Sequence, residues 1–308
     1  MKNLQKKIKD LNLNDINTIF YLNDSEITQV LKQNIDSITK IKEELPQKTK
    51  RLWLKNEIKK VEQYSNPLNS GSNNIDSILD GGFFPGKIYL IFGEFNTGKT
   101  QLCHQLATNI FFKEISSISN SIPSLTLYLD TENTFRPERI KQLASSLNED
   151  SESVLNSIDR TQIIGSTALT VVFDKIEDLI QENKYKLLVI DSITNHFRTD
   201  LNKEGINASM LKNNFIKILG KINEITKRYN LITILTSQIT PAFYKESLIP
   251  VKPVALDLFV HFFSEFIYLS NLEENQRLLH VINSEILPER KCLFIINQEG
   301  IRDYKLLT

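Results

Sequence analysis

The sequence predicts an α/β fold in which a mostly parallel sheet is flanked by helices, and three observations support this. Short, continuous apolar runs rich in β-branched residues recur at 87–93, 124–130, 186–192 and 231–237. Segments with apolar residues at helical spacing separate them, at 99–112, 136–147, 167–182 and 211–228. From about residue 263 the chain favours strands without intervening helices. Continuous apolar runs are typical of strands buried on both faces, as in parallel sheets.

The first 64 residues differ in texture, and we expect them to form a small helical region. They are polar, and their apolar residues recur at helical spacing. The stretch 48–60 is locally basic, which fits either a solvated helix face or a surface for DNA or a partner. Residues 65–74 are rich in Asn, Ser, Gly and Pro and are interpreted as a linker. Residues 75–308 are then expected to form the α/β core.

The end of the core is expected to extend the sheet with antiparallel strands. Three apolar runs, EFIYLSN, RLLHVIN and CLFIINQ, are divided by the polar segments NLEENQ and LPERK. Connections this short join neighbouring antiparallel strands, whereas a parallel crossover needs a dozen residues or more.

Composition excludes several classes of protein. The 308 residues carry 37 basic and 37 acidic side chains, so the formal net charge is +0, which by itself disfavours a nucleic-acid partner but does not exclude a local basic patch. No apolar stretch is long enough to cross a membrane, and the start of the chain has no secretory pattern. Cys103 and Cys292 cannot make a disulfide framework or a four-ligand zinc site. These features favour a reducing, intracellular compartment.

The most informative residues are GEFNTGKT, which follow the strand at 87–93 and open a helix. They match G-x-x-x-x-G-K-[ST] in the strand–loop–helix context that the motif requires, which disfavours a chance glycine turn. Backbone N–H groups at a helix N-terminus favour phosphate, Lys99 can reach the β- and γ-phosphates, and the Thr100 hydroxyl can bind magnesium. Gly93 and Gly98 let the backbone approach closely. We therefore predict a nucleotide site formed by Gly93, Glu94, Phe95, Asn96, Thr97, Gly98, Lys99, Thr100 and Gln101.

Three further polar residues follow predicted strands. Asp191 ends an apolar strand, as does the carboxylate that holds magnesium in P-loop NTPases, although a helix cap is the alternative. Glu132 follows another strand and can orient or deprotonate water, or else cap the next helix. Gln238 can sense the γ-phosphate or serve ordinary turn chemistry. The predicted metal ligands are Thr100 and Asp191, and the predicted catalytic residues are Lys99, Glu132 and Gln238.

These motifs, in this order, resemble the RecA-like recombinases, closest to the archaeal RadA and eukaryotic Rad branch. The similar segments are GEFNTGKTQLCHQLA, DTENTFRPERI, LLVIDSITNHFR and LPERKCLFIINQEGIRD, and SGSNNIDSILDGGFFPGKI resembles the approach to the first core strand. The resemblance covers about residues 70–308. It implies a RecA-like P-loop ATPase core that binds ATP and Mg²⁺ and is stimulated by DNA. It also implies an intracellular protein, cytoplasmic if archaeal and nuclear if eukaryotic.

The resemblance assigns two more nucleotide contacts. Arg139 of FRPER would stack on the adenine, which suits a planar guanidinium. His261 matches a histidine near the nucleotide at the subunit interface, although a lone histidine in LFVHFF is otherwise read as a core residue.

The chain departs from the family in its two DNA loops. The first loop has Glu204 and about Met210 where arginines are expected, and Lys203 and Lys212 are its only cations. The second loop has Ala255-Leu256 in place of Gly-Gly, which should reshape it because side chains disfavour positive φ. The N-terminal region lacks an obvious Phe-x-x-Ala polymerisation motif, for which the Leu-Trp-Leu at 52–54 is a candidate substitute or simply core.

Two functions follow from these observations. The first is an ATP-dependent recombinase for homologous recombination and DNA repair, which forms filaments on single-stranded DNA and pairs it with duplex DNA. The second is a divergent paralogue that assists a main recombinase as a mediator. A RecA-like ATPase serving signalling is a remote third. The expected partners are single- and double-stranded DNA and either further copies of the chain or a partner recombinase, with no membrane.

Overall fold

The computed structural model describes residues 66–114, 125–147, 150–183, 185–201, 203, 205, 207–241, 251–255, 258, 262–272 and 275–304. These residues belong to one compact unit, Asn66–Thr308. The predicted helical region 1–64 and the start of the linker lie outside the described residues, so the division of the chain at 65–74 stays a prediction.

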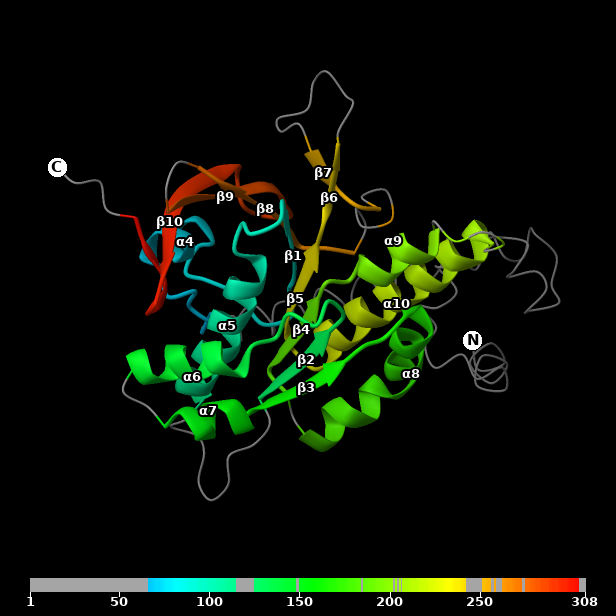
Figure 1. Ribbon diagram of the computed structural model, residues 1–308, viewed down its shortest axis with the longest axis horizontal. Coiled ribbons are helices and arrows are strands. Elements are labelled where there is room, and N and C mark those ends of the chain that lie inside the picture. The colour runs from blue at the N-terminus through cyan, green and yellow to red at the C-terminus, as the bar shows by residue number, and fades with distance from the viewer. Residues whose placement is uncertain are drawn as a thin grey trace, which may run out of the picture. The chain divides into compact units, whose positions relative to one another are not determined.

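The described residues contain a nine-stranded sheet in the order β11-β10-β9-β8-β1-β5-β4-β2-β3 (Figure 1). Every pair from β8 to β3 is parallel, whereas β9, β10 and β11 continue the sheet in antiparallel fashion. The predicted α/β fold with antiparallel C-terminal strands is therefore confirmed. The strands are β1 (Ile88–Gly93), β2 (Thr126–Asp130), β3 (Ile158–Gln162), β4 (Leu187–Asp191), β5 (Ile232–Ser237), β8 (Glu265–Asn271), β9 (Gln276–Ser284), β10 (Arg290–Asn297) and β11 (Gly300–Asp303).

Helices cover both faces of the sheet (Figure 1). One face carries α4 (Asn73–Ile78), α5 (Lys99–Glu114), α6 (Pro137–Ser146) and α7 (Ser151–Asn156), and the other carries α8 (Ser166–Asn183), α9 (Asn195–Leu201) and α10 (Ala208–Arg228). Because side chains alternate along a strand, β1 sends Tyr89 and Ile91 into one core and Ile88, Leu90 and Phe92 into the other. This explains why the run at 87–93 is continuously apolar.

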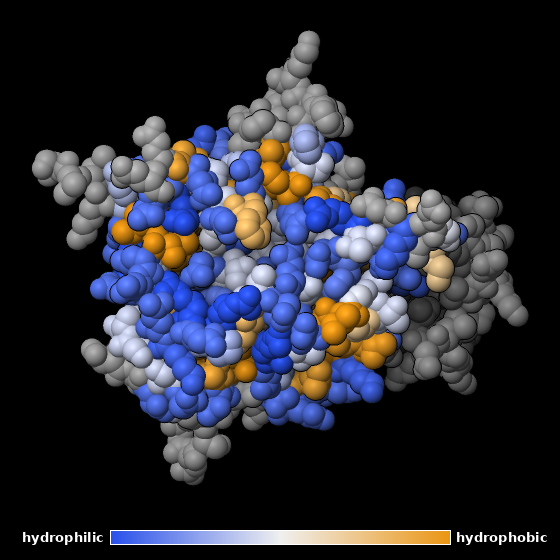
Figure 2. Space-filling view, viewed as in Figure 1, coloured by the Kyte–Doolittle hydropathy of each residue, from blue (hydrophilic) through white to orange (hydrophobic). Residues whose placement is uncertain are grey.

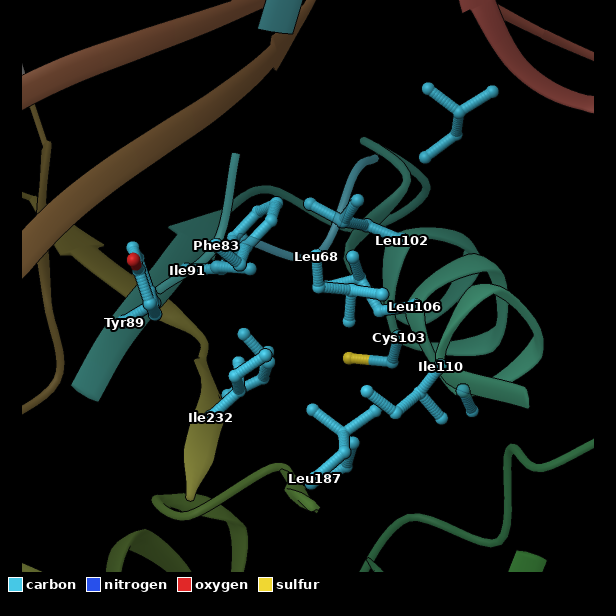
Figure 3. Packing of buried hydrophobic residues seen from close by; sticks show 14 of the residues in the cluster. Leu68, Phe83, Tyr89, Ile91, Leu102, Cys103, Leu106, Ile110, Leu187 and Ile232 are labelled. Atoms are coloured by element: carbon cyan, nitrogen blue, oxygen red, sulfur yellow. The ribbon is translucent and has the colours of Figure 1, made fainter. Parts of the chain in front are cut away.

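The core on the α5 side is closed by residues that are far apart in the sequence. The sulfur of Cys103 on α5 points toward Ile232 of β5 and Leu187 of β4 (Figure 3). Burial raises the pKa of the Cys103 thiol well above its ordinary value, so the thiol stays protonated. Cys103 therefore packs as a small apolar side chain rather than acting as a reactive group.

The apolar runs predicted the four central strands, but the structure corrects the sequence analysis at two places. The first is β8, which we expected in the antiparallel extension: it pairs parallel with β1 and antiparallel with β9 only. The second is the pair α7 and β3, which was not predicted. The burial of β3 falls from Ile158 to three exposed residues at its end, as suits the edge strand of a sheet. Its sequence, IDRTQ, is polar, and for this reason the strand was not predicted.

The parallel strands bring the predicted functional residues to one edge of the sheet. Asp130 and Asp191 are register partners at the ends of β2 and β4. Ser237 ends β5 opposite Phe92 of β1, and Gln238 follows it. Beyond Gln238 lies a small antiparallel pair, β6 (Ile239–Pro241) and β7 (Val251–Pro253). Ligands of open α/β sheets bind at this carboxyl edge.

The face seen in Figure 2 is mostly hydrophilic, with small hydrophobic patches separated by polar surface. Among the described residues, no helix has the length and apolarity needed to span a bilayer.

Candidate functional site

The loop after β1 is shaped to bind phosphate. Asn96 and Gly98 adopt left-handed backbone conformations, with φ of 62° and 105°, and α5 begins directly after at Lys99. A Cβ on Gly93 would lie 2.2 Å from the backbone oxygen of Leu269, so the strand end tolerates only glycine there. The loop therefore turns the chain tightly and presents the N-terminus of a 16-residue helix, where backbone N–H groups favour an anion.

Lys99 reaches back over this loop. Its Nζ donates hydrogen bonds to the backbone oxygens of Gly93 (2.9 Å) and Glu94 (2.6 Å). Burial lowers the pKa of Lys99, and the nearby carboxylates of Asp191 and Glu132 oppose that shift. The amine thus sits above the loop where a phosphate would meet it.

Asp191 is a buried carboxylate surrounded by hydroxyl groups. Its Oδ2 accepts hydrogen bonds from Thr100 (2.7 Å), Tyr128 (3.1 Å) and Thr134 (3.3 Å), and its Oδ1 accepts one from Thr236 (2.5 Å). It is 2% exposed and makes these contacts instead of capping a helix. The predicted metal ligands, Thr100 and Asp191, therefore touch. A hydroxyl and a carboxylate are the oxygen ligands that Mg²⁺ prefers.

Glu132 and Gln238 are also in contact. Glu132 Oε1 accepts hydrogen bonds from Gln238 Nε2 (2.9 Å) and from Ser192 Oγ (2.8 Å). The following helix α6 has Arg136 as its N-cap and no side-chain cap bond, so Glu132 does not serve as the cap. The carboxylate is held beside Asp191 by two donors from neighbouring strand ends.

Arg139 is fixed at the other end of the cleft. Its Nε donates to Gln101 Oε1 (2.8 Å), and its terminal nitrogens donate to the backbone oxygens of Asn297 (2.8 Å) and Gln298 (2.9 Å). The guanidinium is thereby oriented between α6 and the turn after β10. The remaining predicted contact, His261, lies outside the described residues.

These groups line one cleft of about 720 Å³. Of the predicted residues, it is lined by Phe95, Asn96, Thr97, Gly98, Lys99, Thr100, Gln101, Glu132, Arg139 and Asp191. Gly93, Glu94 and Gln238 are not among the lining residues; Gln238 acts on the cleft through Glu132. Seven further residues line the cleft and were not predicted from the sequence, namely Thr134, Arg136, Ser192, Thr236, Arg277, Ile296 and Asn297.

Arg277 is the most consequential of the missed residues. It comes from β9, and its Nε is buried without a hydrogen-bond partner. Its side chain packs against the loop, with Cδ 3.6 Å from where a Cβ on Gly98 would stand. A buried N–H without an acceptor favours an anion in the cleft. Nothing in the sequence pattern marked this arginine, because only the sheet order brings β9 near the loop.

Comparisons with known proteins identify the family of the chain. The sequence model of the Rad51 family matches residues 64–304. A DNA repair and recombination protein RadA from Aeropyrum pernix is 31% identical over 239 residues, which are 77% of this chain and 73% of that protein. The family match spans every element of the cleft. The chain therefore belongs to the Rad51 family of RecA-like recombinases.

Proposed function

We propose that the chain is an ATP-dependent, DNA-binding recombinase that acts in homologous recombination and DNA repair, forming filaments on single-stranded DNA for strand exchange. One observation carries the proposal: a phosphate loop, a buried carboxylate bonded to that loop and a second carboxylate bonded to an amide share one cleft. Membership of the Rad51 family supports it, as does the likeness to an archaeal DNA repair and recombination protein.

The chain's own groups suffice to bind and orient a nucleoside triphosphate. The backbone of the loop and the N-terminus of α5 bind the phosphates, and Lys99 exchanges its bonds to Gly93 and Glu94 for phosphate oxygens. Arg277 adds an N–H donor on the opposite wall. The plane of Arg139 offers a face on which the adenine stacks.

The cleft also fits Mg²⁺. Thr100 Oγ1 and Asp191 Oδ2 lie 2.7 Å apart and provide oxygen ligands only. Among the described residues, no group of three or more His, Cys, Asp or Glu side chains could hold a metal by itself. That donor set suits Mg²⁺, which commonly takes one or two protein ligands and completes its shell with phosphate and water. Bound there, Mg²⁺ would neutralise charge on the phosphates.

Glu132 is the residue that we assign to water activation. Its carboxylate lines the cleft and accepts hydrogen bonds from Gln238 and Ser192, which fix its direction. A carboxylate so held can orient a water molecule and take its proton. Because Gln238 contacts Glu132 and precedes β6, movement of Gln238 toward a phosphate would alter Glu132 and the following loop together.

The second candidate, a mediator that assists a main recombinase, is favoured by the DNA loops. Lys203, one of two cations in the first loop, is paired with Asp200 at 2.5 Å, and Met210 is 64% exposed where the family resemblance implies arginine. In the second loop Ala255 has a left-handed backbone with φ of 61°. Alanine disfavours this conformation, so the backbone is strained there although the conformation is present. Leu256 lies outside the described residues.

Replacing Lys99 tests the nucleotide site. Lys99→Ala is expected to abolish ATP turnover, because no other described lysine lines the cleft. The matched control is Lys113→Ala, which removes a lysine from the far end of the same helix, where it bonds the backbone oxygen of Asn66. The measurement is phosphate release with and without single-stranded DNA. Undiminished turnover in Lys99→Ala would overturn the assignment.

Strand exchange separates the two candidates. The purified chain with ATP and Mg²⁺ is mixed with single-stranded DNA and a homologous duplex, alone and with an added partner recombinase. Exchange by the chain alone excludes the mediator function, and light scattering then reports filament growth on the single strand. Exchange that appears only with the partner, and exceeds what the partner achieves by itself, supports the mediator.

A further inference from the structure

A buried aspartate next to the cleft holds both arms of a turn. Asp130, the last residue of β2, is 0% exposed, and its carboxylate accepts hydrogen bonds from the backbone N–H groups of Thr134 (3.1 Å) and Phe135 (3.2 Å). Arg160 on the neighbouring strand β3 donates to the same carboxylate, at 2.7 Å from Nη2. Burial raises the pKa of Asp130, but these hydrogen bonds outweigh it and hold the pKa below its ordinary value.

The same nitrogen of Arg160 also reaches the tip of the turn. Its Nη2 lies 2.9 Å from Asn133 Oδ1. Asn133 has a φ of 56°, a left-handed conformation that asparagine tolerates better than most residues because its short side chain can bond locally. One guanidinium thus joins the end of β2 to the residue after Glu132.

Glu132 lies between these two anchor points. It lines the cleft, whereas Asp130, Asn133 and Arg160 are not among the residues that line it. Arg160 therefore does not touch a ligand in the cleft, and the turn 131–135 is the segment that links its two bonds to Glu132. The two donors to Glu132, Ser192 and Gln238, come from other elements, so the carboxylate keeps its direction only while the turn stays in place.

We propose that Arg160 is a positioning residue for Glu132. By bonding Asp130 and Asn133 together it fixes the turn 131–135 and so the direction in which the Glu132 carboxylate faces the cleft. The inference rests on the proposed ATP hydrolysis, in which Glu132 orients water. It assigns a function in that reaction to β3, an edge strand that the sequence analysis did not find.

Turnover and nucleotide affinity are measured on Arg160→Met, Arg160→Lys and the control Arg290→Met. Arg290 also pairs with an aspartate, Asp80, but on the surface. Arg160→Met is expected to lower kcat about 10- to 100-fold, because small misplacement of a reacting group has that effect. The Kd for a fluorescent ATP analogue should change less than twofold. Arg160→Lys should recover part of kcat, and Arg290→Met should behave as the wild type.

A second arm distinguishes positioning from general destabilisation. In a Glu132→Gln background, Arg160→Met should not lower the residual single-turnover rate further, because the group that it positions is already gone. A further loss there, an unchanged kcat in Arg160→Met, or a nucleotide affinity that falls in step with kcat would each overturn the inference. If Arg160→Met does not fold, Asn133→Gly replaces it, since that change removes the bond at the tip and leaves the Arg160–Asp130 pair.

Hydrogen exchange of backbone amides tests the positioning of the turn independently of catalysis. The amides of Thr134 and Phe135 donate to Asp130, so Arg160→Met should increase exchange in a peptide covering 131–136. Unchanged protection would refute the positioning of the turn even if the wild type hydrolyses no ATP. A wild type that turns over no ATP and binds no nucleotide would instead refute the proposed function.

Discussion

His104 lies behind the cleft, and its chemistry is set by burial. It is 1% exposed, its Nδ1 has no hydrogen-bond partner, and its Nε2 accepts the backbone N–H of Arg136 at 3.3 Å. Its ring stacks on Tyr128 and meets Phe135 edge-on. The pKa of His104 is lowered to about 4, chiefly by burial and also by the nearby Arg139 and Arg136, while Asp130 opposes them. The imidazole is therefore neutral at physiological pH and supports the turn as an acceptor.

His104 should make the protein less stable in mild acid. An unfolded histidine takes up a proton near pH 6.5, whereas the folded one does so only near pH 4. Its contribution is thus fully present above pH 6.5 and is lost as the pH falls from 6.5 to 4. Between pH 7 and pH 5 the free energy of unfolding should fall about 2 kcal/mol more in the wild type than in His104→Asn, by urea denaturation. Equal losses in the two proteins would refute the shift.

Site residues that belong to contiguous motifs could be predicted from the sequence. Site residues that the sheet brings close from distant strands could not. The loop residues, Asp191 and Glu132 each lie at or just after an apolar strand within one short segment, so the sequence offered them as candidates, with helix capping as the alternative for the two carboxylates. Arg277 and Arg160 each lie in a different strand from the groups that they contact. Their positions depend on the order of the strands and on register, such as the pairing of Tyr128 with Arg160.

At the scale of elements, two glycines should respond oppositely to alanine. At Gly93 the register partner across β1 and β8 is Leu269, whose backbone oxygen would lie 2.2 Å from a new Cβ. Gly93→Ala should therefore destabilise the protein by about 1–3 kcal/mol. Gly220 lies in the middle of α10 with only Phe262, at 4.0 Å, near its Cβ position. Gly220→Ala should stabilise it by about 0.5–1 kcal/mol. Chemical denaturation of both variants checks the signs, and a neutral Gly93→Ala would contradict the close packing.

Buried strands and amphipathic helices were predictable because their apolar patterns are imposed locally. The strands β1, β2, β4 and β5 are fully buried, so each reads as a continuous apolar run. The edge strand β3 is exposed along most of its length and lacks that pattern. The direction of β8 was not predictable either. Its sequence fits either orientation, and only the register of the folded sheet shows that it pairs parallel with β1.

For the whole molecule, the zero net charge has a measurable consequence. Of the two lysines in the predicted first DNA loop, Lys203 is paired with Asp200 and Lys212 is exposed. Each phosphate contact on single-stranded DNA contributes about −0.7 to the slope of log affinity against log salt, so the two lysines of this loop contribute no more than about −1.4. Affinity for single-stranded DNA should accordingly be weak, and its slope with salt shallow.

Fluorescence anisotropy with a labelled single strand, titrated over a salt series, measures that slope. Lys212→Ala should make it shallower by about 0.7. A slope steeper than about −3 in the wild type would contradict the prediction and would point to cations outside this loop, such as the basic stretch 48–60.

The bonds that Lys99 makes to its own loop turn nucleotide binding into a competition. The ammonium group already donates to two carbonyl oxygens, so an incoming phosphate finds one N–H of Lys99 free and gains the others only by displacing Gly93 and Glu94. The measured affinity then reports the difference between two sets of hydrogen bonds rather than the strength of either. The carbonyl oxygens of the loop therefore compete with phosphate for Lys99. If their hydrogen bonds to Lys99 were weaker, the affinity for the nucleotide would be higher.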